Sequence, residues 1–314
     1  MKRHSVLFLT IILAMQVMHA QADIAMSTSW YNRSNYNPAS IARLNYLYFF
    51  SNVRQQWINV VGAPKSLNIQ LSGFNYNRRS AFGFSLTNDN IGFSESINPM
   101  LSYAYRINKN EEWSLSFGLS AGVFYRNLNT DDFNPENPAD PILNGDFEKL
   151  LTPDANVGME FQSQHFIAGV SGTHLFSISN SNPYYLISNH RYGYLIFKST
   201  ESEVMNVYTG LQFINRANIL VTEINASLRF KSPTGLVAGS RELFDVGVTY
   251  RTSKQLSAMV GVNLSSDLRI GYSFDQTFLP GYNSNSSHEI VLEYRIPLMS
   301  ARCPVCNFDD SWYR

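Results

Sequence analysis

The stretch Trp113-Ser114-Leu115-Ser116-Phe117-Gly118-Leu119-Ser120-Ala121-Gly122-Val123-Phe124-Tyr125-Arg126 alternates apolar residues with residues that, apart from Phe124, are small or polar, at a period of two. A helix would scatter both sets around its circumference, whereas a strand places each set on a face of its own. The apolar face has an aromatic residue at each end and consists of Trp113, Leu115, Phe117, Leu119, Ala121, Val123 and Tyr125. Aromatic residues at both ends of an apolar row suit the two interfacial girdles of a membrane barrel. The stretch therefore predicts a strand that crosses a lipid bilayer.

Similar alternating rows recur along the chain, and in the clearest of them the second face carries charges and glycines, as a polar lumen requires. They cover residues 44–57, 67–76, 82–86, 101–107, 157–161, 166–176, 191–198, 205–214, 223–230, 244–251, 256–264, 268–275 and 289–296. In the row over residues 67–76, the apolar residues move from odd to even positions at Gly73. Such a change at a glycine predicts a β-bulge there. Together the rows predict about 14 strands (roughly 12 to 16), an even number as in bacterial barrels.

The expected fold is all-β: a transmembrane antiparallel up-and-down β-barrel over residues 44–297. A soluble β-sandwich or propeller would also alternate and is the alternative. Strands of about ten residues or more suit a tilted membrane crossing better than a soluble sheet. The longest breaks between rows, residues 127–154, 177–190 and 278–287, all follow odd-numbered strands. If the N-terminus starts in the periplasm, these breaks lie on the outer face, where such barrels carry long loops.

The composition excludes some classes of function. The chain has 24 Lys and Arg against 24 Asp and Glu, which argues against a nucleic-acid binder because phosphate recognition needs a basic face. Aromatic residues make up 14% of the chain and charged ones only 15%, whereas about a quarter of residues are charged in soluble domains. The mean hydropathy is still −0.17, as expected when lipid-facing and luminal residues alternate.

The N-terminus predicts export. Lys2, Arg3 and His4 precede an apolar stretch over residues 6–15, and Ala20-Gln21-Ala22 follows. A short basic region, about ten apolar residues and a small-x-small site define a secretory signal of the Sec type. We expect a signal peptide over residues 1–22, a periplasmic segment over 23–43, the barrel over 44–297 and a periplasmic tail over 298–314. Removing Lys2 and Arg3 leaves 22 basic against 24 acidic residues, a net charge of −2.

No stretch of the sequence predicts catalysis, so we expect no enzyme and no cofactor. The carboxylates of residues 127–154 suggest Ca²⁺ ligands, but their spacing differs from that of an EF-hand and a solvated loop is favoured. Cys303-Pro304-Val305-Cys306 has redox or half-zinc spacing without the context of either. A local disulfide between Cys303 and Cys306, or two plain thiols, is the favoured interpretation. The histidines have no metal-ligand spacing, and no nucleophile motif is present.

Two stretches are more specific than alternation. The first contains Asn37-Pro38-Ala39, then Arg54-Gln55-Gln56-Trp57 and Gly62-Ala63-Pro64. The second runs from Gly271-Tyr272-Ser273-Phe274-Asp275 to His288-Glu289-Ile290-Val291-Leu292-Glu293-Tyr294. Together they resemble the PorP/SprF family of outer-membrane proteins, which is associated with type IX secretion and gliding motility. The motif residues are Asn37, Pro38, Arg54, Gln56, Trp57, Gly62, Pro64, Gly271, Tyr272, Asp275, His288, Glu289 and Tyr294.

We interpret these residues as parts of the barrel architecture, with contact to a partner as the alternative. Asn37-Pro38 would break the chain before the first strand. Trp57 would lie at a membrane interface and Gly62-Ala63-Pro64 would form a tight outer turn. His288 and Glu289 would make polar contacts at the rim, where the closing strand starts.

The resemblance implies an outer-membrane barrel that assists secretion or surface anchoring of a large adhesin-like cargo. It would act with periplasmic or lipoprotein components of the type IX machinery, surrounded by outer-membrane lipid. A passive porin or a transporter of a hydrophobic solute is the alternative function.

Overall fold

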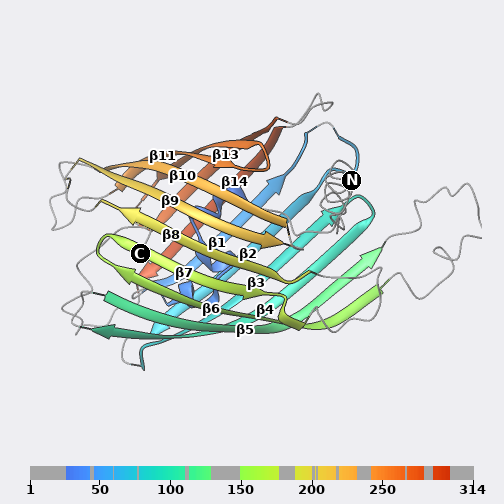
Figure 1. Ribbon diagram of the computed structural model, residues 1–314, viewed down its shortest axis with the longest axis horizontal. Coiled ribbons are helices and arrows are strands. Elements are labelled where there is room, and N and C mark those ends of the chain that lie inside the picture. Colours follow the sequence, from blue (N-terminus) through green and yellow to red (C-terminus); the bar gives the residue numbers. More distant parts are fainter. Residues whose placement is uncertain are drawn as a thin grey trace, which may run out of the picture.

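The structure is a computed structural model that describes residues 26–42, 46–58, 60–75, 78–109, 113–128, 149–176, 188–199, 202, 204–216, 219–231, 242–265, 267–278 and 286–297. Over these residues the chain forms a closed antiparallel barrel of 14 strands, in which β1 pairs with β14 (Figure 1). The strands are β1 (Tyr46–Gln55), β2 (Lys65–Asn75), β3 (Ser80–Ile91), β4 (Ser94–Lys109), β5 (Trp113–Leu128), β6 (Lys149–Ser163), β7 (Phe166–Thr173), β8 (His190–Lys198), β9 (Met205–Arg216), β10 (Ile219–Lys231), β11 (Glu242–Arg251), β12 (Gln255–Asn263), β13 (Leu268–Thr277) and β14 (Ser286–Pro297). The predicted fold class and strand number are confirmed.

The two faces of the sheet differ as the alternation predicts. On β5, Phe117 and Leu119 are exposed on the outside, whereas Ser116 and Ser120 are buried on the inside. The same arrangement holds on β13, where Ile270 is exposed and Arg269 is buried. Apolar side chains outside and charged ones inside reverse the order of a soluble protein, so the soluble sandwich or propeller is excluded. Within the described residues, no helix is long and apolar enough to cross a membrane.

Strand directions fix which segments share an end of the barrel. Tyr46 at the start of β1 pairs with Pro297 at the end of β14, so the first strand begins and the last strand ends at the same end of the barrel. We call this the chain-end side. The connections after β5, β7 and β13, residues 129–148, 174–189 and 278–285, leave from the opposite end. We call that end the loop side.

The predicted bulge at Gly73 is wrong. Gly73 pairs with Leu47 of β1 and with Phe82 of β3, and neither ladder shifts in register there. The apolar phase changes because Phe74 faces the lumen and packs in a buried cluster with Ile41. The register shift observed in this barrel lies instead between Phe230 and Lys231 of β10, where β10 pairs with β11.

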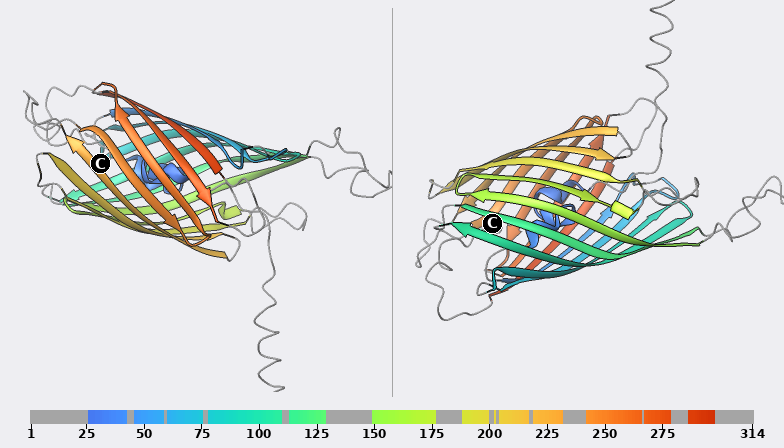
Figure 2. Two further views of the ribbon diagram at one scale, coloured as in Figure 1. Left: turned by 90° about the horizontal axis from the view of Figure 1, so that it is seen from above. Right: turned by 60° about the horizontal axis from the view of Figure 1, so that its bottom comes forward.

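Residues 26–42 lie inside the barrel, and we call them the plug (Figure 2). They form three short 3₁₀ helices, η1 (Ser27–Trp30), η2 (Arg33–Asn35) and η3 (Pro38–Ile41). The sequence predicted a periplasmic segment over residues 23–43; in the structure its described part occupies the lumen. The physical reason is that its polar side chains find charged and amide partners on the luminal face. The predicted signal peptide over residues 1–22 and the tail over 298–314 lie outside the described residues.

Candidate functional site

The plug fills the lumen by burying apolar side chains against several walls. Trp30 packs with Ile167, Tyr192 and other luminal residues of β7 to β9, and Ile41 packs with Phe74. Trp30 lies over Gly210, where a Cβ atom would stand only 2.3 Å from the indole ring. Each large apolar side chain buried in this way contributes about 1.5–3 kcal/mol to stability. The plug is therefore a packed part of the barrel core.

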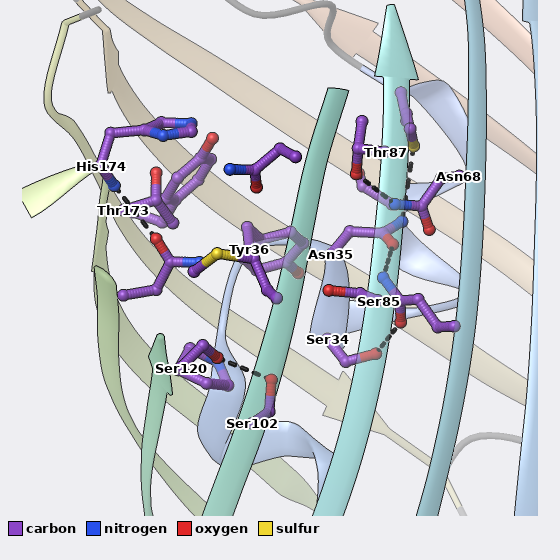
Figure 3. A pocket seen from close by; sticks show the side chains of 18 of the residues that line it. Ser34, Asn35, Tyr36, Asn68, Ser85, Thr87, Ser102, Ser120, Thr173 and His174 are labelled. Atoms are coloured by element: carbon purple, nitrogen blue, oxygen red, sulfur yellow. Dashed lines mark hydrogen bonds between the residues drawn. The ribbon is translucent and has the colours of Figure 1, made fainter. Parts of the chain in front are cut away.

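Amide groups bind the plug to β2. The Asn32 amide donates to Gln70 Oε1 at 2.7 Å, and the Ser34 hydroxyl donates to the same oxygen. Gln70 in turn donates to the Asn35 side chain. Figure 3 shows Ser34 and Asn35 of the plug facing this wall of the barrel. Gln70 is buried, and these contacts satisfy both ends of its amide.

A salt bridge binds the plug to β6. Arg33 donates to both carboxylate oxygens of Glu160, from Nε at 2.8 Å and from Nη2 at 3.1 Å. This two-point geometry is the strong form of an arginine–carboxylate contact. The Tyr194 hydroxyl of β8 donates to the same carboxylate. Because both charged side chains are buried, the pair fixes the rotational position of η2 inside the barrel.

Asn37 and Pro38 begin η3. The Asn37 side chain accepts a hydrogen bond from the Ala39 amide at 3.0 Å, which is an N-cap, and Pro38 occupies the first position of the helix. The Asn37 amide also donates to the Tyr194 hydroxyl at 2.8 Å. The predicted break before the first strand is thus a capped turn in the lumen.

Two luminal glycines make room for η3. A Cβ atom on Gly118 would lie 2.2 Å from the Ala39 nitrogen, and one on Gly158 would lie 2.0 Å from Asn37 Oδ1. Side-chain carbons never come so close to neighbouring atoms, so both positions must lack a side chain while η3 is in place.

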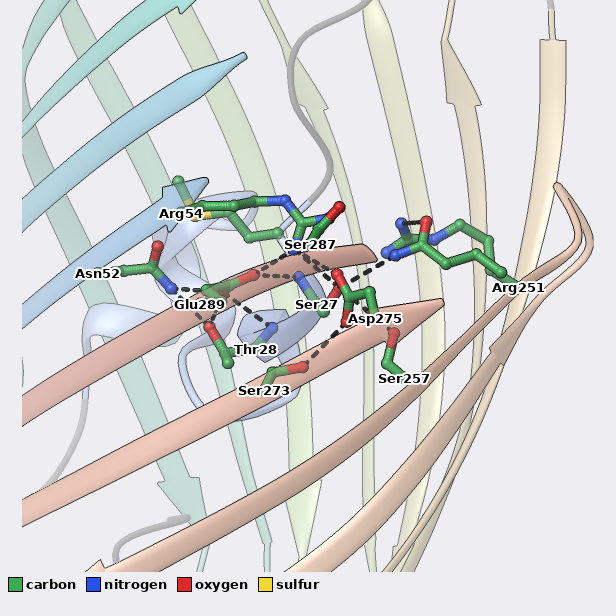
Figure 4. Close-up of polar contacts among 12 residues, drawn as sticks. Ser27, Thr28, Asn52, Arg54, Arg251, Ser257, Ser273, Asp275, Ser287 and Glu289 are labelled. Atoms are coloured by element: carbon green, nitrogen blue, oxygen red, sulfur yellow. Dashed lines mark hydrogen bonds and ion pairs between the residues drawn. The ribbon is translucent and has the colours of Figure 1, made fainter. Parts of the chain in front are cut away.

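Three charged motif residues meet at the N-terminal end of the plug. Arg54 of β1, Asp275 of β13 and Glu289 of β14 form a buried cluster that we call the seat (Figure 4). Arg54 Nη1 lies 2.6 Å from Asp275 Oδ2 and 2.7 Å from Glu289 Oε2. They come together because β1 closes the barrel against β14.

The seat holds η1 by its first residues. The Ser27 backbone amide donates to Glu289 Oε2 at 2.8 Å, and the Thr28 amide donates to Oε1 at 3.1 Å. The Ser27 hydroxyl donates to Asp275 at 2.7 Å, and Asn52 of β1 donates to Thr28 Oγ1 at 2.6 Å. The two backbone amides and the Ser27 hydroxyl satisfy carboxylate oxygens that would otherwise be costly to bury.

A second charged group lies deeper and contacts the end of η1. The Tyr31 hydroxyl donates to Asp245 at 2.9 Å, and the Arg269 guanidinium lies 4.2 Å from the Tyr31 ring centre. Arg269 pairs with Asp245 and, at 2.6 Å, with Glu293. Burial raises the pKa of the Tyr31 phenol, so this side chain remains a neutral donor.

The remaining motif residues of the first stretch lie at the β1–β2 connection. The Gln56 backbone amide donates to the Pro64 carbonyl at 2.9 Å. Trp57 follows β1, has a φ of +43° and is 40% exposed. Gly62 has a φ of +73°, which favours glycine, in the turn closed by the Ala63 amide and the Val60 carbonyl.

The later motif residues divide between the two faces of the sheet. Gly271 faces inward and lies against Tyr31. Tyr272 and His288 are neighbours on the outer face, with 2.5 Å between the Tyr272 hydroxyl and His288 Nδ1. Tyr294 is exposed on the same face. The predicted rim contact therefore applies to His288, whereas Glu289 is fully buried in the seat.

Sequence reasoning missed Ser27, Thr28, Arg33 and Glu160 as plug contacts. The only available signal was indirect, since Arg33 and Asn37 lie in a polar stretch without the period of a strand or a long helix. Residues 129–148 of the acidic stretch 127–154 lie outside the described residues, and so do Cys303 and Cys306. The ends of that stretch are strand rather than solvated loop: residues 127–128 end β5 and residues 149–154 begin β6, where the buried Asp154 pairs with His174 at 2.8 Å. Among the residues that the structure describes, no three His, Cys, Asp or Glu side chains gather into a group that could hold a metal ion.

Comparison with known proteins identifies the family to which the chain belongs. The model of a family described as type IX secretion system membrane protein PorP/SprF matches residues 18–294. The closed barrel and this match together support an outer-membrane location. No curated protein matches the chain.

Solved structures that resemble the chain include three barrels. A mutant of the monoaromatic hydrocarbon channel TodX has a TM-score of 0.49 at 9% identity, covering 87% of this chain and 95% of that one. The monoaromatic hydrocarbon channel CymD has a TM-score of 0.48 at 12% identity, covering 88% and 94%. The Acinetobacter baumannii outer membrane protein Omp33 has a TM-score of 0.43 at 8% identity, covering 81% and 100%.

Proposed function

Because the chain belongs to the PorP/SprF family of type IX secretion system membrane proteins, we propose that it assists the secretion or surface anchoring of a large adhesin-like cargo. In this role it is a component of, or accessory to, the type IX secretion and gliding machinery. It binds periplasmic or lipoprotein components of that machinery as well as the cargo. The proposal includes no catalytic reaction and no cofactor.

The observation that supports this role is the plug. Its contacts reach β2 through Gln70, β6 through Glu160 and the β13–β14 pair through Asp275 and Glu289. A segment tied to several walls fits a rigid docking body in the membrane better than an open conduit. Polar contacts in a low-dielectric interior are costly to break one at a time, so the plug is expected to stay in place while partners bind.

The two ends of the barrel suit two kinds of partner. The first strand begins and the last strand ends at one end, and the long connections leave from the other. With β1 starting in the periplasm, periplasmic components would bind at the chain-end side and surface cargo at the loop side. Loops on a rigid scaffold are common binding elements.

The test is deletion of the gene, followed by mass spectrometry of the surface and secreted proteins. We expect one large adhesin-like protein to be lost from the surface, and the wild-type gene supplied in trans to restore it. A second complementation, with the variant Ser27→Ala and Thr28→Ala, removes the two hydroxyls that contact the seat and Asn52 and tests whether those contacts are needed. An unchanged surface and secreted proteome in the deletion strain would refute the proposed function.

Conductance separates this proposal from the passive porin or solute transporter. Purified protein in planar bilayers is expected to show little steady conductance, because the plug occupies the lumen. Stable porin-like conductance by the intact protein, together with an unchanged surface proteome in the deletion strain, would favour the alternative.

A further inference from the structure

The plug runs through the barrel from the loop side to the chain-end side. Its first residues lie in the seat, which is built at the loop-side ends of the strands. Arg54 is the last residue but one of β1, and Glu289 is the fourth residue of β14. At the other end of the plug, Arg106 Nη1 donates to the Ala42 carbonyl at 3.0 Å. Arg106 lies three residues before the end of β4, which is at the chain-end side.

Contacts at both ends fix this direction. At the loop side, the Ser27 backbone amide donates to Glu289 at 2.8 Å and its hydroxyl donates to Asp275 at 2.7 Å (Figure 4). At the chain-end side, Ile41 packs in a buried cluster with Phe74 and Ala81, where β2 ends and β3 begins. The plug therefore runs opposite to β1, and its first residue is held far from the end at which β1 starts.

Chain length limits where the mature N-terminus can lie. With the predicted signal peptide over residues 1–22 removed, three residues precede Met26. Three fully extended residues span at most about 11 Å. The ten residues of β1 rise about 33 Å along the strand, which is about 25 Å along the axis of a barrel whose strands tilt by about 40°. Three residues are too few to lead back from the seat to the chain-end side.

We propose that the mature N-terminus opens at the loop side, on the cell surface, and that the chain passes down through the lumen before β1 begins. The loop side is the end predicted to face outward, because barrels of this kind carry their long connections there. The segment over residues 23–43 was predicted to be periplasmic. On this topology only its end, where it leads into Tyr46 of β1, faces the periplasm.

The topology decides which partner can reach the free end of the plug. A partner at the loop side meets the mature N-terminus directly before η1 and its contacts with the seat. A periplasmic partner meets the plug only where it continues into β1. The N-terminus thus joins the loops as a binding element of the outer face. That this partner is the secreted cargo rests on the proposed function, whereas the position of the N-terminus does not.

The test is cysteine labelling of intact cells with a membrane-impermeant polyethylene glycol maleimide. The full chain carries Cys303→Ser and Cys306→Ser, and the reporter is Ala25→Cys, directly before Met26. Two exposed positions calibrate the sides of the membrane. Asn90→Cys lies near the loop-side end of β3, and Arg78→Cys lies in the β2–β3 turn at the chain-end side.

We expect Ala25→Cys and Asn90→Cys to be labelled on intact cells, and Arg78→Cys to be labelled only after the outer membrane is permeabilised. Ser27→Cys is the matched comparison for the reporter, because the Ser27 side chain is fully buried in the seat. It should react at least about tenfold more slowly than Ala25→Cys, since labelling requires local opening of the plug.

A second readout does not depend on thiol reactivity. A short epitope inserted between Asp23 and Ile24 should bind its antibody on intact cells. Mass spectrometry of the N-terminal peptide checks the cleavage site, and heat-modifiable migration on a gel checks that each variant is folded.

Three results would overturn the proposal. They are labelling of Ala25→Cys only under the conditions that label Arg78→Cys, an epitope found in the denatured protein but not on intact cells, and an Asn90→Cys variant that stays unlabelled on intact cells. None of these readouts uses the secretion phenotype. The topology can therefore fail while the proposed secretion role holds, and the reverse is equally possible.

Discussion

Replacement of Arg54 by methionine tests the seat most directly. Arg54, Asp275 and Glu289 are fully buried, and one guanidinium nitrogen serves both carboxylates. The variant Arg54→Met keeps most of the side-chain volume but leaves two buried carboxylates facing each other without a cation. The variant thus lacks the guanidinium that holds together Asp275 and Glu289, the two carboxylates that accept hydrogen bonds from the plug.

The size of the effect follows from the geometry. The two carboxylate oxygens lie 2.6 and 2.7 Å from the same nitrogen, so they are at most about 5.3 Å apart. At an effective dielectric constant of about 20, two unit charges at that distance repel by about 3 kcal/mol. Removing one partner of a buried pair generally costs about 3–5 kcal/mol. We expect Arg54→Met to lower the free energy of unfolding by about 3–5 kcal/mol.

A second substitution should restore most of that loss. In Arg54→Met with Asp275→Asn, only Glu289 remains charged, and it keeps the backbone amides of Ser27 and Thr28 and the Asn52 amide as donors. Replacing a buried ion pair by neutral groups is often nearly neutral for stability. The double variant is therefore expected to be more stable than Arg54→Met alone.

The assay is urea unfolding of the protein in lipid vesicles, followed by the fluorescence of its four tryptophans. The matched control is Arg191→Met, because Arg191 is an exposed residue of β8 that faces away from the lumen. A surface change of this kind should alter the free energy of unfolding by less than about 0.5 kcal/mol. If Arg54→Met and Arg191→Met have the same small effect, the seat does not hold the plug and the reasoning above is refuted.

Three further predictions concern the plug. Deleting residues 26–42 should raise single-channel conductance in planar bilayers, and an unchanged conductance would show that these residues do not obstruct the lumen. Gly118→Ala places a Cβ 2.2 Å from the Ala39 nitrogen and should cost about 1–3 kcal/mol in unfolding free energy; Gly193→Ala, which meets nothing within 4 Å, should cost nothing measurable. Burial raises the pKa of Tyr31 above the usual value of about 10, so the unfolded chain loses this proton first and stability falls as pH rises past 10. Tyr31→Phe should therefore flatten the decline in unfolding free energy between about pH 9 and 11, and an unaltered slope would contradict the assignment.

The barrel could be predicted from the sequence because its signal is local. On β5, the alternation of apolar and small residues by itself defines the outer and inner faces, and the structure follows it. The prediction failed at Gly73 for a reason that lies outside β2. Phe74 is apolar and yet luminal because Ile41 of the plug covers it, and no pattern within β2 contains that information.

The plug could not be predicted, because short 3₁₀ helices leave no periodic pattern in a sequence. Arg33 and Asn32 would be expected on a surface, yet both are fully buried. Their partners, Glu160 and Gln70, are 127 and 38 residues away. Only the closed barrel brings these side chains together, so the site depends on tertiary structure from the start.

Five of the 13 residues that gave the family resemblance build the plug or hold it. Asn37 and Pro38 begin its last helix, and Arg54, Asp275 and Glu289 make its seat. Read along the sequence, the early and late motifs are separated by more than 200 positions and look like two unrelated features. They are one feature because β1 pairs with β14 and closes the barrel at that point. It follows that a chain carrying both motifs should carry the plug as well as the barrel. A chain with the Arg54 position neutral should also have lost one of the two carboxylates, since a lone buried pair of like charges is too costly to keep.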